Sequence, residues 1–547
     1  MFGDEVNVLK KLPIGIQTFR DIILNDFVYV DKTRQIYNLI RDAKYYFLSR
    51  PRRFGKSLLL DTIGEVFGGD RELFNGLWIY NSDYTFIKHP VIKLDMSGMS
   101  NESPDALKES IMSYLDIYYE ADGLEIKDKN PADALRRLIM TLNRLYGQKV
   151  VVLIDEYDKP ILDHIEDLPI ANGNRQVLRG FYGILKSMDP YLGFVFITGV
   201  TKFTKTSIFS GLNNLRDITM SEFYSDICGI PVESLDDVFA EHIANVNTIK
   251  KFQQFATIND AILAWYDGYS WDGIKKLLNP FSLLNFFADK KINSYWYATG
   301  TPWFLIDMIK KKPESYLLLH KFRITEMMLD TFDIDRIAIE PLLFQTGYLT
   351  VREVEDAKIP PAYVLDIPNQ EVRDAFNLQV VSAFTESGEI RTGQAKMEIN
   401  EALESGDLRK MLDILRGLFA SIPYELHVEK EAYYHSVFYA IMTLLGFDME
   451  VEVSVSRGRV DAVLELEDKV YVMEFKYEKC PRDANEEMKR KLFNAALNNA
   501  MIQINNKRYG DRYIGSGKKL YKAAFAFLGR DDIEMIVVDE NQAYQVL

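Results

Sequence analysis

Residues 50–57, which read RPRRFGKS, carry the first set of side chains that could do phosphate chemistry. They lie between a predicted strand, Tyr45–Ser49, and a predicted helix, Ser57–Phe67. Amides at a helix N-terminus and a lysine hold phosphates, and a serine hydroxyl at this place ligates Mg²⁺. The segment therefore predicts a phosphate-binding loop. It departs from the usual pattern G-x-x-x-x-G-K-[ST] because Arg50 replaces the first glycine.

Two predicted strand ends supply groups that could work with this loop. The apolar run Val150–Ile154 ends in Asp155 and Glu156. A carboxylate at the first position can hold Mg²⁺ through water, and one at the next can orient an attacking water. The alternative is a helix N-cap pair. Thr198 ends the predicted strand Gly193–Thr198, where it either senses the γ-phosphate or caps the strand.

The segment RVDAVLELEDKVYVMEFK, residues 459–476, predicts a β-hairpin with a two-residue turn at Glu467-Asp468. With that turn, the numbers of paired residues sum to 935, so Asp461 lies opposite Glu474. Side chains alternate along a strand, so Lys476 points to the same face as Glu474. The other face is predicted to be a core face, because its residues are apolar (Val460, Ala462, Leu464, Leu466, Tyr471, Met473 and Phe475).

Two facing carboxylates repel each other, so Asp461 and Glu474 favour a cation between them. Oxygen ligands suit Mg²⁺, with Mn²⁺ as an alternative, and Lys476 could orient water or stabilise a charged transition state. This arrangement predicts metal-dependent phosphodiester hydrolysis. The alternative is an ordinary hairpin with one solvated, charge-paired face.

The predicted helices around the hairpin add further candidates. Glu431 and His435 share a face of the helix Glu429–Leu445, and His435 is expected to be a packed residue. Gln503 lies near the end of the helix Asn485–Asn506. Residues 476–530 contain 13 Lys or Arg and 5 Asp or Glu, a net charge of +8 that would suit a nucleic-acid backbone.

The elements that must position these residues fall into three regions. Strands and helices alternate through residues 1–230, which predicts an α/β fold: a P-loop parallel sheet with helices on both faces. Residues 231–425 are mostly helical and form a lid region that could include a winged helix. Residues 426–547 predict a separate α+β domain.

Composition excludes several classes of protein. The 547 residues carry a net charge of −15, which argues against a protein whose whole surface binds nucleic acid. Two cysteines are too few for a disulfide framework or a cysteine zinc site, and they suit a reducing compartment. No apolar run reaches the 18 or more residues of a membrane helix. We expect a soluble, cytoplasmic protein without a membrane partner.

Several blocks resemble the bacterial AAA-ATPase-like family, a P-loop ATPase typically fused to a C-terminal nuclease-like domain. The blocks are LPIGIQTFRDI, YVDKT, FLSRPRRFGKS, LIDEYDKPI and FITGVTKFTKTSIFSGLNNLRDIT, across residues 8–220. An arginine at the first glycine position fits that family's own loop. The resemblance implies ATP contacts at Arg53, Gly55, Lys56 and Ser57, and Mg²⁺ or water contacts at Asp155 and Glu156.

Residues 425–530 resemble the PD-(D/E)XK nuclease superfamily in the order helix, D…E-x-K hairpin, helix with glutamine, which implies a restriction-endonuclease-like fold for residues 426–547. The resemblance implies catalytic roles for Asp461, Glu474 and Lys476, with the two carboxylates as metal ligands. It extends to Glu431 as a further metal ligand and to Gln503. Val460 stands where the superfamily's proline would precede Asp461.

The sequence thus predicts an ATP-hydrolysing protein with a metal-dependent nuclease domain that cleaves nucleic acid, DNA rather than RNA. Defence against foreign DNA and mobile-element processing are roles that this family resemblance suggests. The alternative is a nucleotide-dependent regulatory switch whose nuclease-like domain only binds nucleic acid or a partner. Arg216 is an arginine-finger candidate by position alone, and a homo-oligomer is left open.

Overall fold

A computed structural model of the chain describes residues 9–547 apart from a set of short segments. Those segments are residues 122, 124, 203–207, 248–254, 297–304, 307, 310–321, 330–337, 358, 386–387, 406, 422–430, 445–448, 456–457, 466–467, 482, 509–510, 514–516, 530–531, 540–544 and 547. The chain forms two compact units. The first comprises residues 1–299 and 321–371, and the second comprises residues 300–320 and 372–547.

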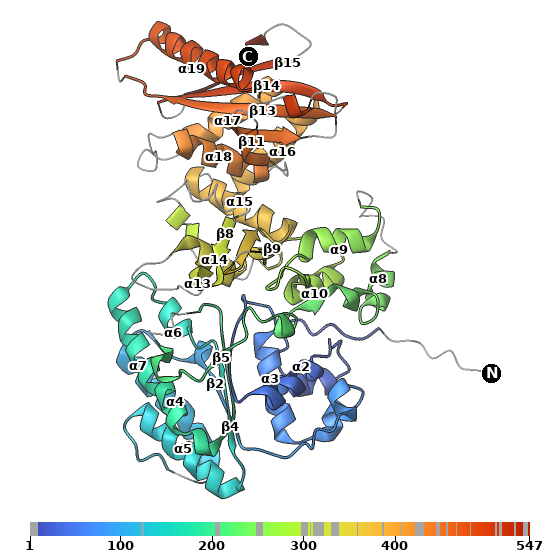
Figure 1. The fold of residues 1–547 in the computed structure, drawn as a ribbon, viewed down its shortest axis with the longest axis vertical. Coiled ribbons are helices and arrows are strands. Elements are labelled where there is room, and N and C mark those ends of the chain that lie inside the picture. Colours follow the sequence, from blue (N-terminus) through green and yellow to red (C-terminus); the bar gives the residue numbers. More distant parts are fainter. Residues whose placement is uncertain are drawn as a thin grey trace, which may run out of the picture. The chain divides into compact units, whose positions relative to one another are not determined.

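The first unit is built on a parallel sheet in the order β2-β3-β4-β1-β5. Its strands are β1 (Tyr45–Ser49), β2 (Val91–Asp95), β3 (Val150–Asp155), β4 (Leu192–Gly199) and β5 (Arg216–Asp217). The helices around it are α1 (Phe19–Leu24), α2 (Thr33–Asp42), α3 (Lys56–Gly68), α4 (Pro104–Ala121), α5 (Pro131–Tyr146), α6 (Lys159–Leu162) and α7 (Leu168–Ser187). Helices α2 and α3 lie on one side of the sheet and α4–α7 on the other (Figure 1).

This arrangement confirms the predicted α/β fold with helices on both faces. Every residue of β3 is buried, as expected of an apolar, β-branched strand covered on both sides. Helix α5 begins at Pro131 after the N-cap Asn130, whose side chain accepts a hydrogen bond from the Ala132 amide at 2.8 Å. Strand β4 lies between β1 and β3. The carboxyl ends of three adjacent strands therefore carry the loop, Thr198 and Asp155.

Residues 230–371 of the first unit add helices and two small antiparallel sheets. The elements are β6 (Ile230–Pro231), α8 (Ala240–Asn247), α9 (Ile258–Tyr266), β7 (Leu277–Leu278), α10 (Pro280–Asp289), β8 (Phe322–Thr325), α13 (Glu326–Leu329), α14 (Ile339–Thr346), β9 (Thr350–Glu355) and β10 (Ala362–Asp366). Strands β8, β10 and β9 pair in that order, and β6 pairs with β7. The predicted extents of the lid region and its winged helix stay predictions.

The second unit centres on a mixed sheet in the order β11-β12-β13-β14-β15-β16. Its strands are β11 (Met449–Val455), β12 (Gly458–Glu465), β13 (Lys469–Glu478), β14 (Lys519–Leu528), β15 (Asp532–Asp539) and β16 (Gln545–Val546). Its helices are α16 (Gly388–Ser405), α17 (Leu408–Ala420), α18 (Glu431–Leu444) and α19 (Glu486–Asn506), preceded by α15 (Gln370–Thr385), which begins in the first unit.

Both faces of this second sheet are covered. Helix α19 packs on one face through Ala496, Ala500 and Ile504, which join a core with Val470 and Val472 of β13. Helix α18 covers the other face, where the ring of Phe438 packs at a tilt against the rings of Phe475 and Phe525. The layers are visible in Figure 1, with α19 on one side of β13–β15 and α17 and α18 on the other. None of the helices in the described part of the chain has the length and apolarity needed to cross a membrane.

Candidate functional site

The loop between β1 and α3 has the backbone shape of a phosphate cradle. Gly55 adopts a left-handed conformation (φ 92°) directly before Lys56, the first residue of α3, and Arg53 is also left-handed (φ 63°). The ammonium of Lys56 is buried and donates to the carbonyls of Arg50 and Pro51, both at 2.9 Å. These bonds hold the loop closed around its lysine.

A cleft of about 380 Å³ opens beside this loop and brings several predicted residues together. Arg53, Gly55, Lys56, Ser57 and Glu156 all line it, as predicted from the sequence. Arg52 and Lys159 line it too, although no sequence motif singles them out. Four cationic side chains thus face one carboxylate, which makes the cleft suitable for a polyphosphate. Lys159 is also paired with Asp163 at 2.7 Å.

The two carboxylates that end β3 have different environments. Asp155 is buried and accepts a hydrogen bond from the Thr198 hydroxyl on the neighbouring strand β4. It also accepts from the amide of Glu156 at 3.0 Å. Glu156 has a left-handed backbone (φ 48°), which turns its side chain away from the strand direction and toward the cleft. Burial raises the pKa of Glu156, as do the charges of Asp155 and Asp158, against the opposing effect of Lys56.

Asp158, which the sequence reasoning passed over, fixes the end of β4. Its carboxylate is almost fully buried and accepts hydrogen bonds from the amides of Val200 and Thr201 and from the Thr201 hydroxyl. Gly199 makes room for it, since a Cβ there would lie 2.6 Å from the Asp158 carboxylate. Burial raises the pKa of Asp158, and the hydrogen bonds oppose that shift. Asp158 therefore holds the backbone that directly follows Thr198 and so helps to fix the position of Thr198.

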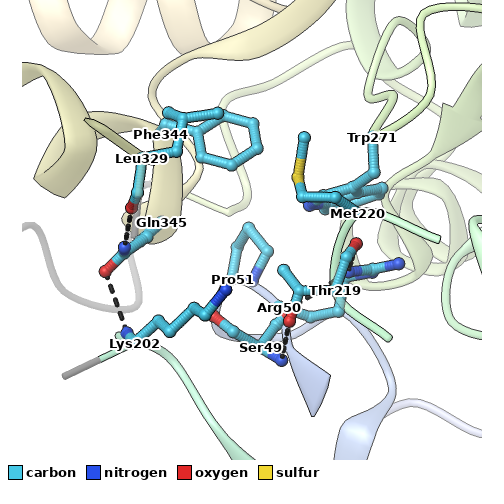
Figure 2. Close-up of a pocket in the computed structure, with 10 residues that line it drawn as sticks. All are labelled: Ser49, Arg50, Pro51, Lys202, Thr219, Met220, Trp271, Leu329, Phe344 and Gln345. Atoms are coloured by element: carbon cyan, nitrogen blue, oxygen red, sulfur yellow. Dashed lines mark hydrogen bonds between the residues drawn. The ribbon is translucent and has the colours of Figure 1, made fainter. Parts of the chain in front are cut away.

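Arg50, the departure from the glycine pattern, is a buried anchor. Its guanidinium donates to the carbonyls of Ser49 and Thr219 at 2.8 and 2.9 Å, and to those of Tyr224 and Ser225 at 3.4 Å. It also lies 3.9 Å from the ring centroid of Trp271. Burial lowers the pKa of Arg50 to about 10, within a range where the side chain stays charged at neutral pH. Figure 2 shows Arg50 beside Thr219 and Trp271.

The rest of the loop is braced by segments far away in the sequence. The indole of Trp296 donates to the Arg52 carbonyl at 3.1 Å, and the Trp296 amide donates to the buried carboxylate of Glu371 at 2.7 Å. Pro51 packs against the turn at Gly347 so closely that a Cβ on this glycine would lie 2.8 Å from it. Beside this contact, Gln345 accepts from the Lys202 amide and donates to the Leu329 carbonyl (Figure 2).

Arg216, the arginine-finger candidate, lies on the edge strand β5. It pairs with Tyr46 near the middle of β1. Its guanidinium lies 3.6 Å from the Asp42 carboxylate and faces the rings of Tyr46 and Tyr224. These contacts give it a local partner at the sheet edge, and a finger role stays a prediction.

The hairpin of the second unit has the register that the sequence predicts. Ala462 pairs with Met473, Val463 with Val472 and Leu464 with Tyr471, so paired numbers sum to 935. Glu467, the first residue of the predicted turn, lies outside the described residues. The ladder ends before Asp461, whose carboxylate instead accepts a hydrogen bond from the Phe475 amide at 2.9 Å. Asp461 thus lies beside Glu474 at the point where the two strands separate.

Glu474 is the most unusual carboxylate of this hairpin. Its side chain is fully buried, and its Oε2 atom has no hydrogen-bond partner. The strand alternation directs it toward α19, and Ala524 and Ala526 on the adjacent strand leave room for Glu474 and Lys476. Burial raises the pKa of Glu474 to about 7, and the neighbouring charge of Asp461 contributes to that rise. The face is therefore buried, which excludes the simple solvated hairpin.

Lys476 lies between carboxylates. Its ammonium donates to Glu474 Oε1 at 3.0 Å and to the Phe475 carbonyl at 2.8 Å, and it lies 3.8 Å from Glu431. Burial alone would lower the pKa of Lys476, but the charges of Glu474, Glu431 and Asp461 outweigh burial and raise it. Lys476 is therefore held in its charged form inside the site.

The remaining candidates surround this group. Glu431 begins α18 and accepts from the Tyr477 amide at 3.3 Å, so its carboxylate also holds the end of β13. His435 stacks on Phe475 at 4.7 Å between centroids, as expected of a packed histidine. Gln503 lies one turn beyond Ala500 on the sheet-facing side of α19. Lys507 follows by another turn, and its charge lowers the pKa of Glu474 against the main effects.

The residues fit a divalent cation, although none of the described His, Cys, Asp and Glu side chains gather into a group of three that could hold a metal unaided. The buried, unpartnered oxygen of Glu474 beside a second carboxylate is a place where a cation would relieve repulsion. Asp461 and Glu474 are the two side chains that would hold it. Water and a substrate phosphate would complete the ligands, as is usual for Mg²⁺.

Comparison with known proteins agrees with both sites. A family model described as a predicted AAA-ATPase matches residues 13–209, and the PD-(D/E)XK nuclease superfamily model matches residues 429–536. The "Uncharacterized protein in vnfD 5'region" of Azotobacter chroococcum mcd 1 is 35% identical over 527 residues, which cover 95% of this chain and 96% of the relative. The chain belongs to this family of AAA-ATPase-like proteins with a C-terminal PD-(D/E)XK nuclease domain.

The family match confirms the resemblance and the fold class that the sequence predicts. In general terms it supports an ATPase and a nuclease-like activity in this AAA-ATPase-like protein. The matched segments enclose both sites, since the first contains the loop and Asp155, and the second contains Asp461, Glu474 and Lys476. The roles of the individual residues stay predictions.

Replacing Arg50 by the glycine of the usual motif should destabilise the protein. Arg50→Gly removes a guanidinium that serves four backbone carbonyls and leaves a cavity beside Trp271, so we expect a loss of at least about 3 kcal/mol in the free energy of unfolding. Arg53→Gly is the matched control, because Arg53 is exposed and its left-handed backbone suits glycine. Chemical denaturation of the two variants checks this. Equal stability of both would contradict the anchoring role of Arg50.

Glu474 should make the metal-free fold sensitive to pH. Its folded-state pKa of about 7 exceeds the ordinary value of 4.5, so the folded state binds this proton more tightly, and stability is lost as the pH rises from 4.5 through 7. Glu474→Gln removes the charge, and Lys476 keeps Glu431 as a partner. We expect the variant to be more stable than wild type by about 1 kcal/mol at pH 8 and no more stable at pH 4.5.

Thermal melts in chelator at the two pH values measure this difference. Added Mn²⁺ should reverse the order at pH 8, because it binds only the wild-type carboxylates. A variant that is less stable than wild type at pH 8 without metal would show that Glu474 is satisfied by its protein neighbours.

Proposed function

We propose that this protein binds and hydrolyses ATP at the loop cleft and cleaves nucleic-acid phosphodiester bonds, DNA in preference to RNA, at the hairpin. The observation that carries the proposal is the buried Glu474, with an unpartnered oxygen beside Asp461 and a charged Lys476 at 3.0 Å. A hairpin that served only for packing would gain nothing from this unsatisfied carboxylate. The loop cleft and its four cations support the ATPase half.

At the loop, we assign a separate role in ATP binding and hydrolysis to each of the chain's own groups. Arg53, Gly55 and Lys56 hold the phosphates, with the α3 amides behind them. Ser57 and Asp155 would hold Mg²⁺, and Thr198, which donates a hydrogen bond to Asp155, would contact the γ-phosphate. Glu156 accepts the proton of the attacking water, a role that its raised pKa favours because a base is most effective near the operating pH.

At the hairpin, Asp461 and Glu474 would hold Mg²⁺ or Mn²⁺, which, when bound, neutralises phosphate charge and increases the acidity of water. Lys476 is held by Glu474 and Glu431 in a position to orient the attacking water or to stabilise the negative charge of the transition state. The net charge of +8 over residues 476–530 favours a nucleic-acid backbone as the partner.

The biological setting is part of the proposal. We place the protein in the cytoplasm, where two cysteines, Cys228 and Cys480, would stay reduced as the free thiols that they are here. Nucleotide binding would gate or drive cleavage, in defence against foreign DNA or in the processing of mobile elements.

The ATPase half is tested with Glu156→Gln and Lys56→Ala in the full-length protein. Glu156→Gln keeps the shape of the side chain and removes the base, so ATP should bind while phosphate release slows by about 10²–10⁴-fold. Lys56→Ala should weaken ATP binding itself. Calorimetric titration and a phosphate-release assay separate the two effects. Wild-type protein that binds ATP without turnover would support the regulatory-switch alternative.

The nuclease half is tested with Asp461→Asn and Lys476→Ala. Asp461→Asn should lose both Mn²⁺ binding and cleavage, because it removes a ligand. Lys476→Ala should keep most Mn²⁺ binding and lose cleavage by about 10²-fold or more, because the lysine acts on the reaction and not on the ion. Lys410→Ala, an exposed lysine on α17, is the matched control. Cleavage of single- and double-stranded DNA and RNA is followed on gels. Retained cleavage in Lys476→Ala would remove this lysine from the mechanism.

A further inference from the structure

We propose that the outer face of helix α19 lies in the major groove of duplex DNA and reads A·T base pairs there. Helix α19 (Glu486–Asn506) packs on the sheet of the second unit with one side, and its other side is exposed to solvent. This inference rests on the proposed cleavage of DNA and adds a sequence preference to it. The hairpin acts on the phosphodiester backbone, which carries no sequence information directly.

Five asparagines lie on the exposed face of α19. They are Asn494, Asn498, Asn499, Asn505 and Asn506. At about 100° per residue, the five fall within an arc of about 140°, in two lines on either side of Ala495 and Ile502. The Ile502 side chain is 55% exposed. In the described part of the chain, no group is hydrogen-bonded to any of the five side-chain amides, so they can bind a partner.

Helix stability does not account for this composition. Asparagine forms helices less readily than alanine, glutamate or lysine, because its side chain competes for the backbone hydrogen bonds. An exposed helix face that served only for solubility would be better filled with charged residues. An asparagine amide instead places a hydrogen-bond donor next to an acceptor without adding charge. The face therefore gives up some helix stability and gains paired hydrogen-bonding groups.

The chemistry of this face matches A·T pairs in the major groove. Adenine presents the N7 acceptor beside the N6 donor there, and one asparagine amide can bind both. Thymine adds its C5 methyl group, which suits an apolar side chain such as Ile502. Guanine presents two neighbouring acceptors and is matched by arginine or lysine, and residues 494–506 contain neither. The major groove of A-form RNA is too narrow for side chains to read, so the partner is duplex DNA.

Basic residues lie beyond both ends of the asparagine stretch, where they can contact phosphates. Arg490 and Lys491 precede it, and Lys507 and Arg508 follow it. Arg490 and Arg508 are exposed. Lys491 forms an exposed ion pair with Glu487 at 2.8 Å, and such a pair contributes little, so a phosphate can replace it. Neutral amides between cationic ends suit base contacts in the groove and phosphate contacts outside it.

The carboxyl end of this face lies near the metal hairpin. Lys507 directly follows Asn506, and its charge acts on the carboxylate of Glu474. From Asn494 to Asn506 the helix rises about 18 Å, which exceeds the major-groove width of about 12 Å. A duplex that takes α19 into its groove is therefore brought to the hairpin that would cut it.

The experiment measures binding of short DNA duplexes to the full-length protein by fluorescence anisotropy, in chelator so that no strand is cut. The duplexes contain only A·T, only G·C or only inosine·cytosine pairs. An inosine·cytosine pair resembles A·T in the minor groove and G·C in the major groove. Wild type should bind the A·T duplex at least about tenfold more tightly than either of the others. Replacing thymine by uracil removes the methyl group and should weaken binding by about threefold or more.

Combining Asn494→Ala, Asn498→Ala and Asn505→Ala removes one line of amides. This variant should bind the A·T and G·C duplexes with affinities within about twofold of each other, and should bind G·C as wild type does. Its melting temperature should not fall, because alanine is the better helix former. Asn38→Ala, at an exposed position on α2, is the matched control and should leave every affinity unchanged.

The outcomes separate this inference from the proposed function. Equal wild-type affinity for the A·T and G·C duplexes would overturn it, as would inosine·cytosine binding as tight as A·T binding. A folded triple variant that keeps the preference, or that loses affinity for all duplexes alike, would also overturn it. If wild type cuts DNA with Mn²⁺ but shows no preference, the inference fails and the nuclease proposal stands. If wild type neither binds nor cuts any duplex, the nuclease proposal itself is wrong. The wild-type comparison needs no substitution, so it decides even if the triple variant fails to fold.

Discussion

The buried guanidinium of Arg50 is the interaction on which the nucleotide site depends. A phosphate loop must keep several backbone amides pointing at one place, and a loop that opens the helix α3 has little secondary structure to hold it. Here the guanidinium collects carbonyls from β1, from the turn after β5 and from Tyr224-Ser225, and it stacks on Trp271. The guanidinium of Arg50 binds several carbonyls at once and so holds the loop at the position where the usual motif has a compact glycine. Lys56 then holds the loop from its inner side through the carbonyls of Arg50 and Pro51.

The two sites handle buried charge in opposite ways. Around Arg50 and Asp158, protein groups satisfy most of the charge, so these residues contribute to a rigid framework. At the hairpin, the charges of Asp461, Glu474 and Lys476 only partly compensate one another, and an oxygen of Glu474 has no partner. Burying a charge without full compensation destabilises a fold, and such cost is commonly associated with function. A bound cation would compensate the buried carboxylates, so the free energy that destabilises the metal-free fold would favour selective binding of a cation.

Sequence reasoning succeeded where the physics is local. The register of β12 and β13 follows from period-two alternation and from the turn, so the sum of 935 could be derived without a fold. The meeting of Asp155 and Thr198 follows from parallel strands whose ends share an edge. Reasoning failed where partners come from distant segments. Three of the four acceptors of Arg50 lie about 170 residues away in the sequence, and the burial of Glu474 depends on α19 and on two alanines of β14.

The braces of the loop show how large the working ATPase is. The matched AAA-ATPase segment ends at residue 209, yet Trp271, Trp296, Gly347 and Glu371 all hold the loop or its supports. Glu371 lies in the first turn of α15. A fragment excised at the family boundary would leave the Arg50 charge in a half-open cavity and the Arg52 carbonyl without its indole donor. The smallest autonomous ATPase that this chain can yield therefore extends past residue 371, to within the helix that leads into the second unit.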